Sequence, residues 1–445
     1  MNKKNVSIVT LGCSKNEVDS EIMQSVMDRD FFTYTSELEE ADVIIVNTCG
    51  FIEAAKEESI DTIIEMAQYK VEGNCKHLIL AGCLAQRYSN ELIEEIPEVD
   101  AIMGTGNIKD LNDILNNLDK KNKIIEINNI DNEYLEGVKR EVNSPFAYLR
   151  ISEGCDNLCT YCIIPQLRGK HRSRKMEDIL TEANNLVEDG VKEIIIIAQN
   201  TSDYGIDLYG EFSLYKLLDE MSKIEGLYLI RLLYLYPDNI DDKLIDTIKN
   251  NNKIAKYVDM PLQHASDNVL KLMNRRTSKE AIKGIITKLR DNIPEMVIRT
   301  TFIVGFPGET ESDYNELYDF IKEVKFDKLG VFTYSREENT PAYSLPNQVD
   351  EEVKDKRRDA IMELQLKISE NLMSNKLGNV YHVMIEEFAE ENLYVGRSFM
   401  DAPEIDGVVY VNSSEDLEIG DIVKVKITEY LEYDLLGELT NEPTQ

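Results

Sequence analysis

The sequence predicts an α/β fold in three parts: an N-terminal parallel α/β domain, a central partial (β/α)6 barrel and a small C-terminal all-β barrel. Strands alternate with helices over the first ~120 residues, the alternation resumes on a larger scale near Phe146, and short strands fill the last ~70 residues. A chain of 445 residues is too long for one hydrophobic core. The predicted parts are residues 1–120, a linker over 121–140, residues 141–372 and residues 373–445.

Short apolar runs, each followed by a helical pattern, define the N-terminal domain. Strands that alternate with helices form βαβ units, so these runs predict a parallel sheet. The polar stretch that follows, with its Asn-Asn and Asp-Asn pairs, is typical of a linker. The predicted strands are Val6–Leu11, Asp42–Val46 and His77–Ala81, and the predicted helices are Glu17–Asp28, Ile52–Gln68 and Asn90–Glu95.

Six strand–helix units indicate an open or partial α/β barrel in the central part. The chemistry of such barrels takes place at the carboxyl ends of the strands. The predicted strands are Phe146–Ile151, Glu193–Ala198, Tyr228–Leu235, Tyr257–Leu262, Val297–Val304 and Lys328–Thr333. The predicted helices between them include Met176–Glu188, Asp241–Lys249, Lys279–Leu289 and Glu311–Val324.

A charged helix over Asp350–Leu377 follows the central part, and the chain then changes character. Short strands separated by Gly and Asn-Ser turns predict a small β-barrel of the kind often used as a binding module. The predicted strands are Val380–Glu386, Asn392–Arg397, Gly407–Val411 and Ile422–Glu429.

The chain is strongly acidic, with 83 Asp and Glu against 49 Lys and Arg and a formal charge of −34. Such a charge repels nucleic acid and membrane surfaces and favours a basic partner, although acidity shared by a whole proteome would look the same. No apolar run approaches the ~20 residues of a membrane helix, and the N-terminus lacks a signal peptide. The sequence predicts a cytoplasmic protein.

Three of the seven cysteines, Cys155, Cys159 and Cys162, form a C-x3-C-x2-C motif just after the first barrel strand. An odd number of cysteines in a chain without a secretory signal favours metal binding or catalysis over disulfides. Three thiolates on one loop can hold three irons of a [4Fe–4S] cluster and leave the fourth iron open to a chelating cofactor. A zinc knuckle is the alternative, but it needs four ligands.

Cys13, Cys49 and Cys83 each follow one of the predicted N-terminal strands. Because the carboxyl ends of parallel strands assemble ligand sites, these three thiols are expected to converge on a second cluster. The alternative is three small cysteines buried in a core. Cys75 precedes its strand and falls outside the pattern.

Two further features accompany the cysteines. Gly305 and Gly308 form a turn at the end of the fifth barrel strand, where glycine lets the backbone approach a ligand closely. The basic run Arg168–Arg174 follows the C-x3-C-x2-C loop and is expected to neutralise a cluster or an anionic cofactor, or else to be simply solvated. The four histidines form no zinc-protease motif, and a nucleophile elbow is absent.

The cysteine motifs and their neighbours resemble the radical SAM methylthiotransferase family over nearly the whole chain. The resemblance implies a radical S-adenosylmethionine (SAM) core and a C-terminal TRAM-like barrel. It also implies two [4Fe–4S] clusters on the six cysteines, with SAM near Tyr161 and Gly305. The stretches that carry it are Leu11–Asn16, Val18–Glu21, Asn47–Ile52, Ala55–Ser59, Ala81–Arg87 and Gly154–Cys162.

Within the family the chain is most similar to the branch that modifies an aspartate of small-subunit (30S) ribosomal protein S12. That branch implies transfer of a methylthio group to the aspartate β-carbon, with an electron donor and a sulfur source that the sequence does not identify. The stretches that distinguish the branch are Arg168–Arg174, Arg231–Pro237 and Pro261–Ser266.

Two alternative functions remain open. The product could be methylthiolated adenosine in tRNA, but the 16 acidic and four basic residues of Met373–Gln445 argue against direct nucleic-acid binding. That balance of −12 suits a basic ribosomal protein. The chain could instead be an iron–sulfur electron carrier or scaffold, but a carrier needs no substrate barrel.

Overall fold

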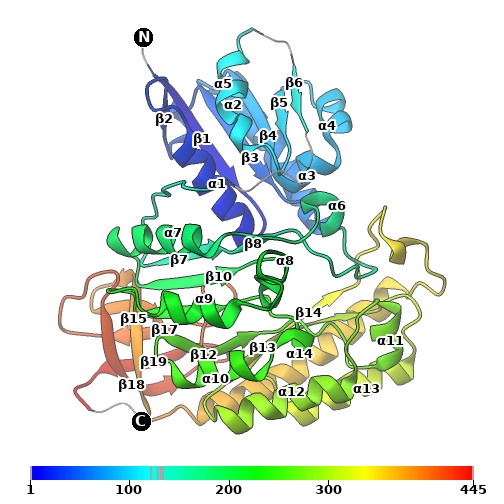
Figure 1. Ribbon diagram of the computed structural model, residues 1–445, viewed down its shortest axis with the longest axis vertical. Helices are drawn as coiled ribbons and strands as arrows, with labels where there is room; N and C mark the ends of the chain where they lie inside the picture. The colour runs from blue at the N-terminus through cyan, green and yellow to red at the C-terminus, as the bar shows by residue number, and fades with distance from the viewer. Residues whose placement is uncertain (1–2, 121–122, 128–129, 131–134, 443–445) are drawn as a thin grey trace. The chain divides into compact units, whose positions relative to one another are not determined.

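The computed structural model describes residues 3–120, 123–127, 130 and 135–442. The chain divides into two compact units. Figure 1 colours the chain by residue number, from blue at the N-terminus to red at the C-terminus. Residues 121–122, 128–129 and 131–134 of the predicted linker lie outside the described residues, and the predicted domain boundaries stay a prediction. The first unit comprises Met1–Val142, Arg150–Asn185 and Ser335–Tyr343, and the second comprises Asn143–Leu149, Leu186–Tyr334 and Ser344–Gln445.

A parallel six-stranded sheet forms the centre of the first unit, in the order β2-β1-β3-β4-β5-β6. The three predicted strands are confirmed and occupy neighbouring positions in it. Sequence analysis missed β2 and β6, which have three residues each, and β5, which is as long as the predicted β4. The strands are β1 (Lys4–Thr10), β2 (Phe32–Tyr34), β3 (Val43–Thr48), β4 (His77–Ala81), β5 (Val99–Met103) and β6 (Ile124–Glu126).

Helices cover this sheet because the strand residues are apolar on both faces. Every residue of β3 is buried, and Ile44 and Val46 pack against Ile63 of α2 and Leu84 of α3. Burial of such side chains contributes roughly 25 cal/mol per Å² of apolar surface. The helices are α1 (Ser14–Val26), α2 (Glu53–Glu72), α3 (Gly82–Arg87), α4 (Ser89–Glu95) and α5 (Leu111–Asn117).

The first unit also contains the C-x3-C-x2-C loop. The antiparallel pair β8 (Ser152–Glu153) and β9 (Arg172–Ser173) closes the loop at its base. The short helix α6 (Ile164–Arg168) lies inside it, and α7 (Met176–Glu188) follows β9. Sequence analysis assigned this segment to the central part, and in the structure Arg150–Asn185 belongs to the first compact unit.

The second unit is built on an open six-stranded sheet in the order β14-β13-β12-β11-β10-β7, parallel from β10 to β14. An open sheet of six strands fits the predicted partial barrel. Its strands are β7 (Phe146–Arg150), β10 (Glu193–Ile197), β11 (Leu229–Leu232), β12 (Ile254–Asp259), β13 (Val297–Val304) and β14 (Lys328–Thr333). The helices that join or follow the strands include α8 (Ile206–Tyr209), α9 (Leu214–Met221), α10 (Asp242–Asn250), α11 (Asp267–Leu272), α12 (Lys279–Asn292), α13 (Glu311–Val324) and α14 (Glu351–Ser374).

The C-terminal strands close into a five-stranded barrel in the order β15-β16-β17-β19-β18. The four predicted strands are confirmed, and β19 is an addition that pairs with β17 and β18 and so completes the barrel. The strands are β15 (Val380–Glu390), β16 (Leu393–Arg397), β17 (Val409–Asn412), β18 (Ile422–Tyr430) and β19 (Leu435–Leu439).

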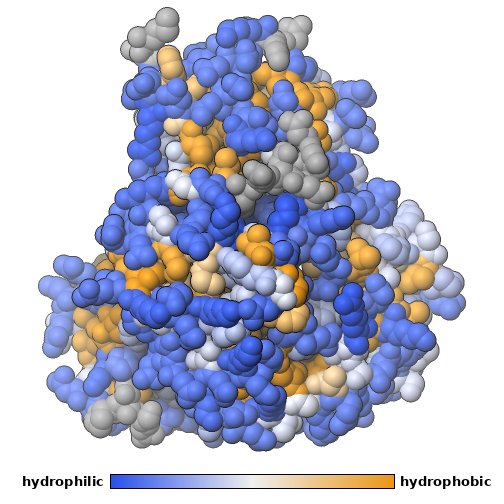
Figure 2. Space-filling view, in the orientation of Figure 1, coloured by the Kyte–Doolittle hydropathy of each residue, from blue (hydrophilic) through white to orange (hydrophobic). Residues whose placement is uncertain are grey.

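Hydrophilic residues occupy most of the face shown in Figure 2. This agrees with a sequence in which 30% of residues are charged. Among the helices of the described residues, none is both long enough and apolar enough to cross a membrane.

Candidate functional site

The N-terminal cysteines stand at one edge of the first unit's sheet. Cys13 caps the start of α1 after β1, Cys49 directly follows β3, and Cys83 is the second residue of α3 after β4. Because β1, β3 and β4 are adjacent and parallel, the three cysteines stand at neighbouring carboxyl ends of the sheet. Their role as ligands of one cluster stays a prediction. The backbone at Gly12, just before Cys13, lies close to Cys49, since a Cβ added to Gly12 would be 3.1 Å from Cys49 Sγ.

The environment of these thiols disfavours the bare thiolate. Burial raises the pKa of the Cys83 thiol to about 12, Arg168 opposes that shift, and charge on Cys13 and Cys49 adds to it. Burial also raises the pKa of Cys49. Three neighbouring thiols therefore need positive charge to ionise together, and an iron–sulfur cluster would supply it.

The donor set fits an iron–sulfur cluster. Soft thiolates without imidazole or carboxylate partners are typical ligands of such clusters. Among the described residues, no three His, Cys, Asp or Glu side chains lie close enough to hold a single metal ion. A four-iron cluster spaces its thiolates more widely than one ion does. Cys75 packs in the sheet's apolar core, and its thiol donates to the His77 carbonyl oxygen at 3.3 Å.

The second triad lies on a loop that backbone contacts hold in place. The Cys155 amide donates to the Gly169 carbonyl oxygen at 3.1 Å, and the Cys162 amide donates to the Cys159 carbonyl oxygen at 3.0 Å. Gly154 has φ +74°, and a Cβ there would lie 2.0 Å from the Lys170 carbonyl oxygen, so only glycine fits. Burial raises the pKa of Cys162, and charge on Cys159 and Cys155 raises it further.

Helix α6 packs against one cysteine of the N-terminal triad. Cys83 contacts Ile163, the residue after Cys162, and Leu167 of α6, and Phe51 joins the same apolar cluster. Sequence analysis gave no sign of this contact, and the role of the six cysteines as ligands stays a prediction.

A short segment of the first unit, Ser335–Tyr343, supports both cysteine loops and was not predicted. Glu337 is buried and pairs with Arg87 at 2.9 Å and Lys56 at 3.0 Å. Arg87 in turn donates to the Gly50 carbonyl oxygen at 2.9 Å, next to Cys49. The Ala342 amide donates to the Thr160 carbonyl oxygen at 2.9 Å, inside the second triad's loop. Local sequence around Glu337 carries no signal of these long-range contacts.

The two residues assigned to SAM belong to different units. Tyr161 is half-buried on the cysteine loop of the first unit. Gly305 follows β13 in the second unit with φ +73°, and Lys354 of α14 fills the space that a Cβ would take, at 2.1 Å. Lys354 is thus a structural reason for glycine at this position, and the SAM assignment stays a prediction.

Two strained residues stand beyond the strands of the second unit's sheet. Tyr234 after β11 and Gln263 after β12 have φ values of 60° and 70°, which cost about 1–3 kcal/mol each in residues other than glycine. The Asp259 carboxylate accepts from the Tyr234 amide at 3.1 Å, and Gln263 exchanges backbone hydrogen bonds with Thr301 and Ile303. Strain of this kind gathers at functional sites. Both residues lie in stretches that the sequence singled out, Arg231–Pro237 and Pro261–Ser266, although it assigned neither a role.

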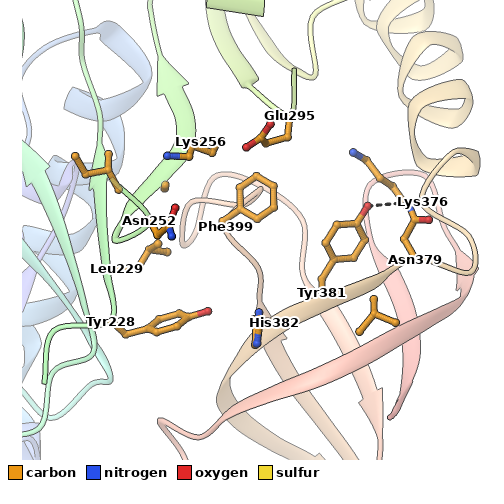
Figure 3. A pocket seen from close by; sticks show the side chains of 13 residues that line it. Tyr228, Leu229, Asn252, Lys256, Glu295, Lys376, Asn379, Tyr381, His382 and Phe399 are labelled. Carbon is orange, nitrogen blue, oxygen red and sulfur yellow. Dashed lines mark hydrogen bonds between the residues drawn. The ribbon is translucent and has the colours of Figure 1, made fainter. Parts of the chain in front are cut away.

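A cavity of about 540 Å³ lies in the second unit between the central sheet and the C-terminal barrel (Figure 3). Tyr228, Tyr381, His382 and Phe399 line it, and Asn379 donates to the Tyr381 hydroxyl at 3.1 Å. Leu229 and Ile254 in its wall begin β11 and β12. The cavity is therefore at the amino ends of the strands, whereas reactions in α/β barrels occur at the carboxyl ends.

Three family models match successive parts of the chain. Residues 5–104 match the uncharacterized protein family UPF0004, residues 149–321 the radical SAM superfamily, and residues 377–440 the TRAM domain. Membership of the radical SAM superfamily implies a [4Fe–4S] cluster and SAM.

Two similar proteins cover the whole chain. "Ribosomal protein uS12 methylthiotransferase RimO" of Clostridioides difficile is 55% identical over 98% of this chain and 99% of its own length. The protein of the same name from Acetivibrio thermocellus is 51% identical, with 100% of both chains covered.

Solved structures at low identity support the fold alone. The radical SAM methyltransferase TsrM from Kitasatospora setae superposes with a TM-score of 0.55 at 13% identity, over 77% of this chain and 74% of that one. The cobalamin-dependent radical SAM enzyme OxsB gives a TM-score of 0.52 at 13% identity, over 82% of this chain and 58% of its own.

Fold, cysteine triads and family models together define a radical SAM enzyme with an additional N-terminal cysteine domain. The C-terminal barrel is a TRAM domain. At 55% identity over nearly all of both chains, the protein belongs to the family of ribosomal protein uS12 methylthiotransferases, RimO.

Proposed function

We propose that this enzyme adds a methylthio group to the β-carbon of an aspartate in ribosomal protein uS12, with the help of two [4Fe–4S] clusters. The names of its full-length relatives state the activity on uS12. The observation that carries the proposal is that both cysteine triads lie in one compact unit, where Cys83 packs against the segment that follows Cys162. A ribosomal substrate also places the proposed reaction in the cytoplasm.

In this proposal each triad holds one cluster. Cys13, Cys49 and Cys83 would bind the auxiliary cluster, and Cys155, Cys159 and Cys162 would bind the cluster whose open iron takes SAM. When bound, these groups supply radical chemistry that can break an unactivated C–H bond, which a positioned base cannot do near neutral pH.

The chain's own residues hold and shield the two sites. The Asn157 amide donates to Cys155 Sγ at 3.4 Å, a contact that favours the thiolate. Phe51, Ile163 and Leu167 pack around Cys83 and exclude water from that side. Exclusion of water protects reactive species from side reactions.

The C-terminal barrel is proposed to dock the basic substrate protein. Of its four basic residues, Arg397 is buried against Glu386 and Lys426 pairs with Glu442 at 2.9 Å. Some of its 16 acidic side chains are buried too, such as Asp401 in its pair with Lys328, but acidic groups still outnumber basic ones and dominate the exposed charge of Met373–Gln445. An acidic surface speeds encounter with a cationic protein and disfavours a phosphate backbone.

The test uses the full-length enzyme reconstituted with iron and sulfide. It is incubated with SAM and a reductant, together with either 30S subunits or bulk tRNA, and both substrates are analysed by mass spectrometry. We expect a methylthio group in place of one hydrogen on uS12 and an unchanged tRNA. Modification of tRNA without modification of uS12 would overturn the proposal.

A further inference from the structure

Arg168, the last residue of α6, reaches from one triad's loop to the other triad. Its side chain is only 3% exposed, and Nη2 donates to Cys83 Sγ at 3.7 Å and to Asn16 Oδ1 at 2.8 Å. Its Nη1 pairs with Asp19 at 2.8 Å and with Glu153 at 3.3 Å. Contacts on three sides therefore fix the guanidinium beside the Cys83 sulfur.

The neighbours of Arg168 keep it charged in spite of its burial. Asp19 and Glu153, which bind its Nη1 group at 2.8 and 3.3 Å, compensate the buried positive charge. The same carboxylates also bind Arg150, with Asp19 at 2.6 Å and Glu153 at 2.9 Å. Two cations and two anions thus form one buried network between α1 and the strand that leads to Cys155.

We propose that Arg168 is a positioning residue that raises the reduction potential of the auxiliary cluster through its charged hydrogen bond to the Cys83 sulfur. The inference rests on the proposed function, in which Cys83 is a cluster ligand. Hydrogen bonds to cluster sulfurs and nearby positive charge both favour the more negative, reduced cluster. A fixed buried cation acts more strongly than an exposed one because water screens it less.

The experiment isolates the auxiliary cluster in the full-length chain. Cys155→Ala, Cys159→Ala and Cys162→Ala together form the background, which is reconstituted with iron and sulfide. Arg168→Gln and Arg168→Lys are added to it, and iron content and an EPR-monitored redox titration are recorded. Lys170→Gln is the matched control, since it removes the same charge from an exposed position in the same basic run.

We expect Arg168→Gln to keep its iron and to shift the midpoint potential to a more negative value. Arg168→Lys should recover part of the shift, because it restores the charge without the full set of donors. Lys170→Gln should match the background. The double variant Asp19→Asn/Arg168→Gln removes one buried charge of each sign, so it should fold even if Arg168→Gln alone does not. Because it also lacks the hydrogen bond to Cys83, it should still show a negative shift, smaller than that of Arg168→Gln.

An unchanged potential in both Arg168→Gln chains would overturn the inference, and so would an equal shift in Lys170→Gln. If the background chain without Cys155, Cys159 and Cys162 bound no iron, the proposed two-cluster assignment itself would be overturned. The iron measurement therefore separates failure of the proposed function from failure of the role given to Arg168.

Discussion

Arg397 of the C-terminal barrel and Glu193 of the central sheet form a buried ion pair at 2.8 Å. Glu193 also pairs with Arg231 of β11 at 2.6 Å, and Arg231 donates to the Phe399 carbonyl oxygen at 2.7 Å. Asp401 adds a pair with Lys328 at 2.7 Å. Within the second unit, the segment after β16 is thus attached to strands β10, β11 and β14 by charges that water does not reach.

Loss of the Glu193 charge should destabilise the second unit. Glu193→Gln leaves Arg231 without a carboxylate and weakens the pairing of Arg397. Removal of one partner of a buried ion pair typically lowers the free energy of unfolding by about 3–5 kcal/mol. The chain has no tryptophan, so circular dichroism during urea unfolding is the suitable measurement. Glu363→Gln removes an exposed pair with Lys367 and should leave unfolding unchanged. Equal unfolding curves for the two variants would contradict the structural role of Glu193.

The two cysteine triads should contribute equally to bound iron. Anaerobically reconstituted protein is expected to bind about eight irons, and replacement of either triad by alanine should remove about half. Cys75→Ala is the control and should retain all of the iron, because its thiol packs in the core of the sheet. If the chain without Cys13, Cys49 and Cys83 kept its full iron content, the assignment of an auxiliary cluster to these residues would be wrong.

Gly154 should be essential for the second triad's loop. Gly154→Ala places a Cβ 2.0 Å from the Lys170 carbonyl oxygen, so the turn before Cys155 must move and about half of the iron should be lost. Gly210→Ala is a matched control, because Gly210 has a similar φ of +71° but open space around it. Iron analysis compares the two variants. Equal iron in both would show that the close contact at Gly154 is not what shapes the loop.

The sequence predicts which cysteines stand at strand ends and which share a loop, and it does so for a physical reason. The β-branched and apolar runs before Cys49 and Cys83 identify buried parallel strands, and parallel order puts residues at their carboxyl ends side by side. The C-x3-C-x2-C spacing likewise needs only local information. Both triads are therefore visible without coordinates.

The contacts that join these parts are not predictable in the same way. Arg168 and Cys83 are 85 positions apart, and Arg87 and Glu337 are 250 apart, so no local pattern connects them. The missed strand β19 has a similar cause. Leu435–Leu439 is short, contains glycine and acquires its role only by pairing with β17 and β18.

The most direct test of the account compares uS12 and tRNA from cells with and without the gene for this protein. Mass spectrometry should find a methylthio group on an aspartate of uS12 in the parent strain and none in the deletion strain. The parent gene should restore the modification, whereas the variant lacking Cys13, Cys49 and Cys83 should not. Unchanged uS12 in the deletion strain, with a methylthio group lost from tRNA, would contradict the account.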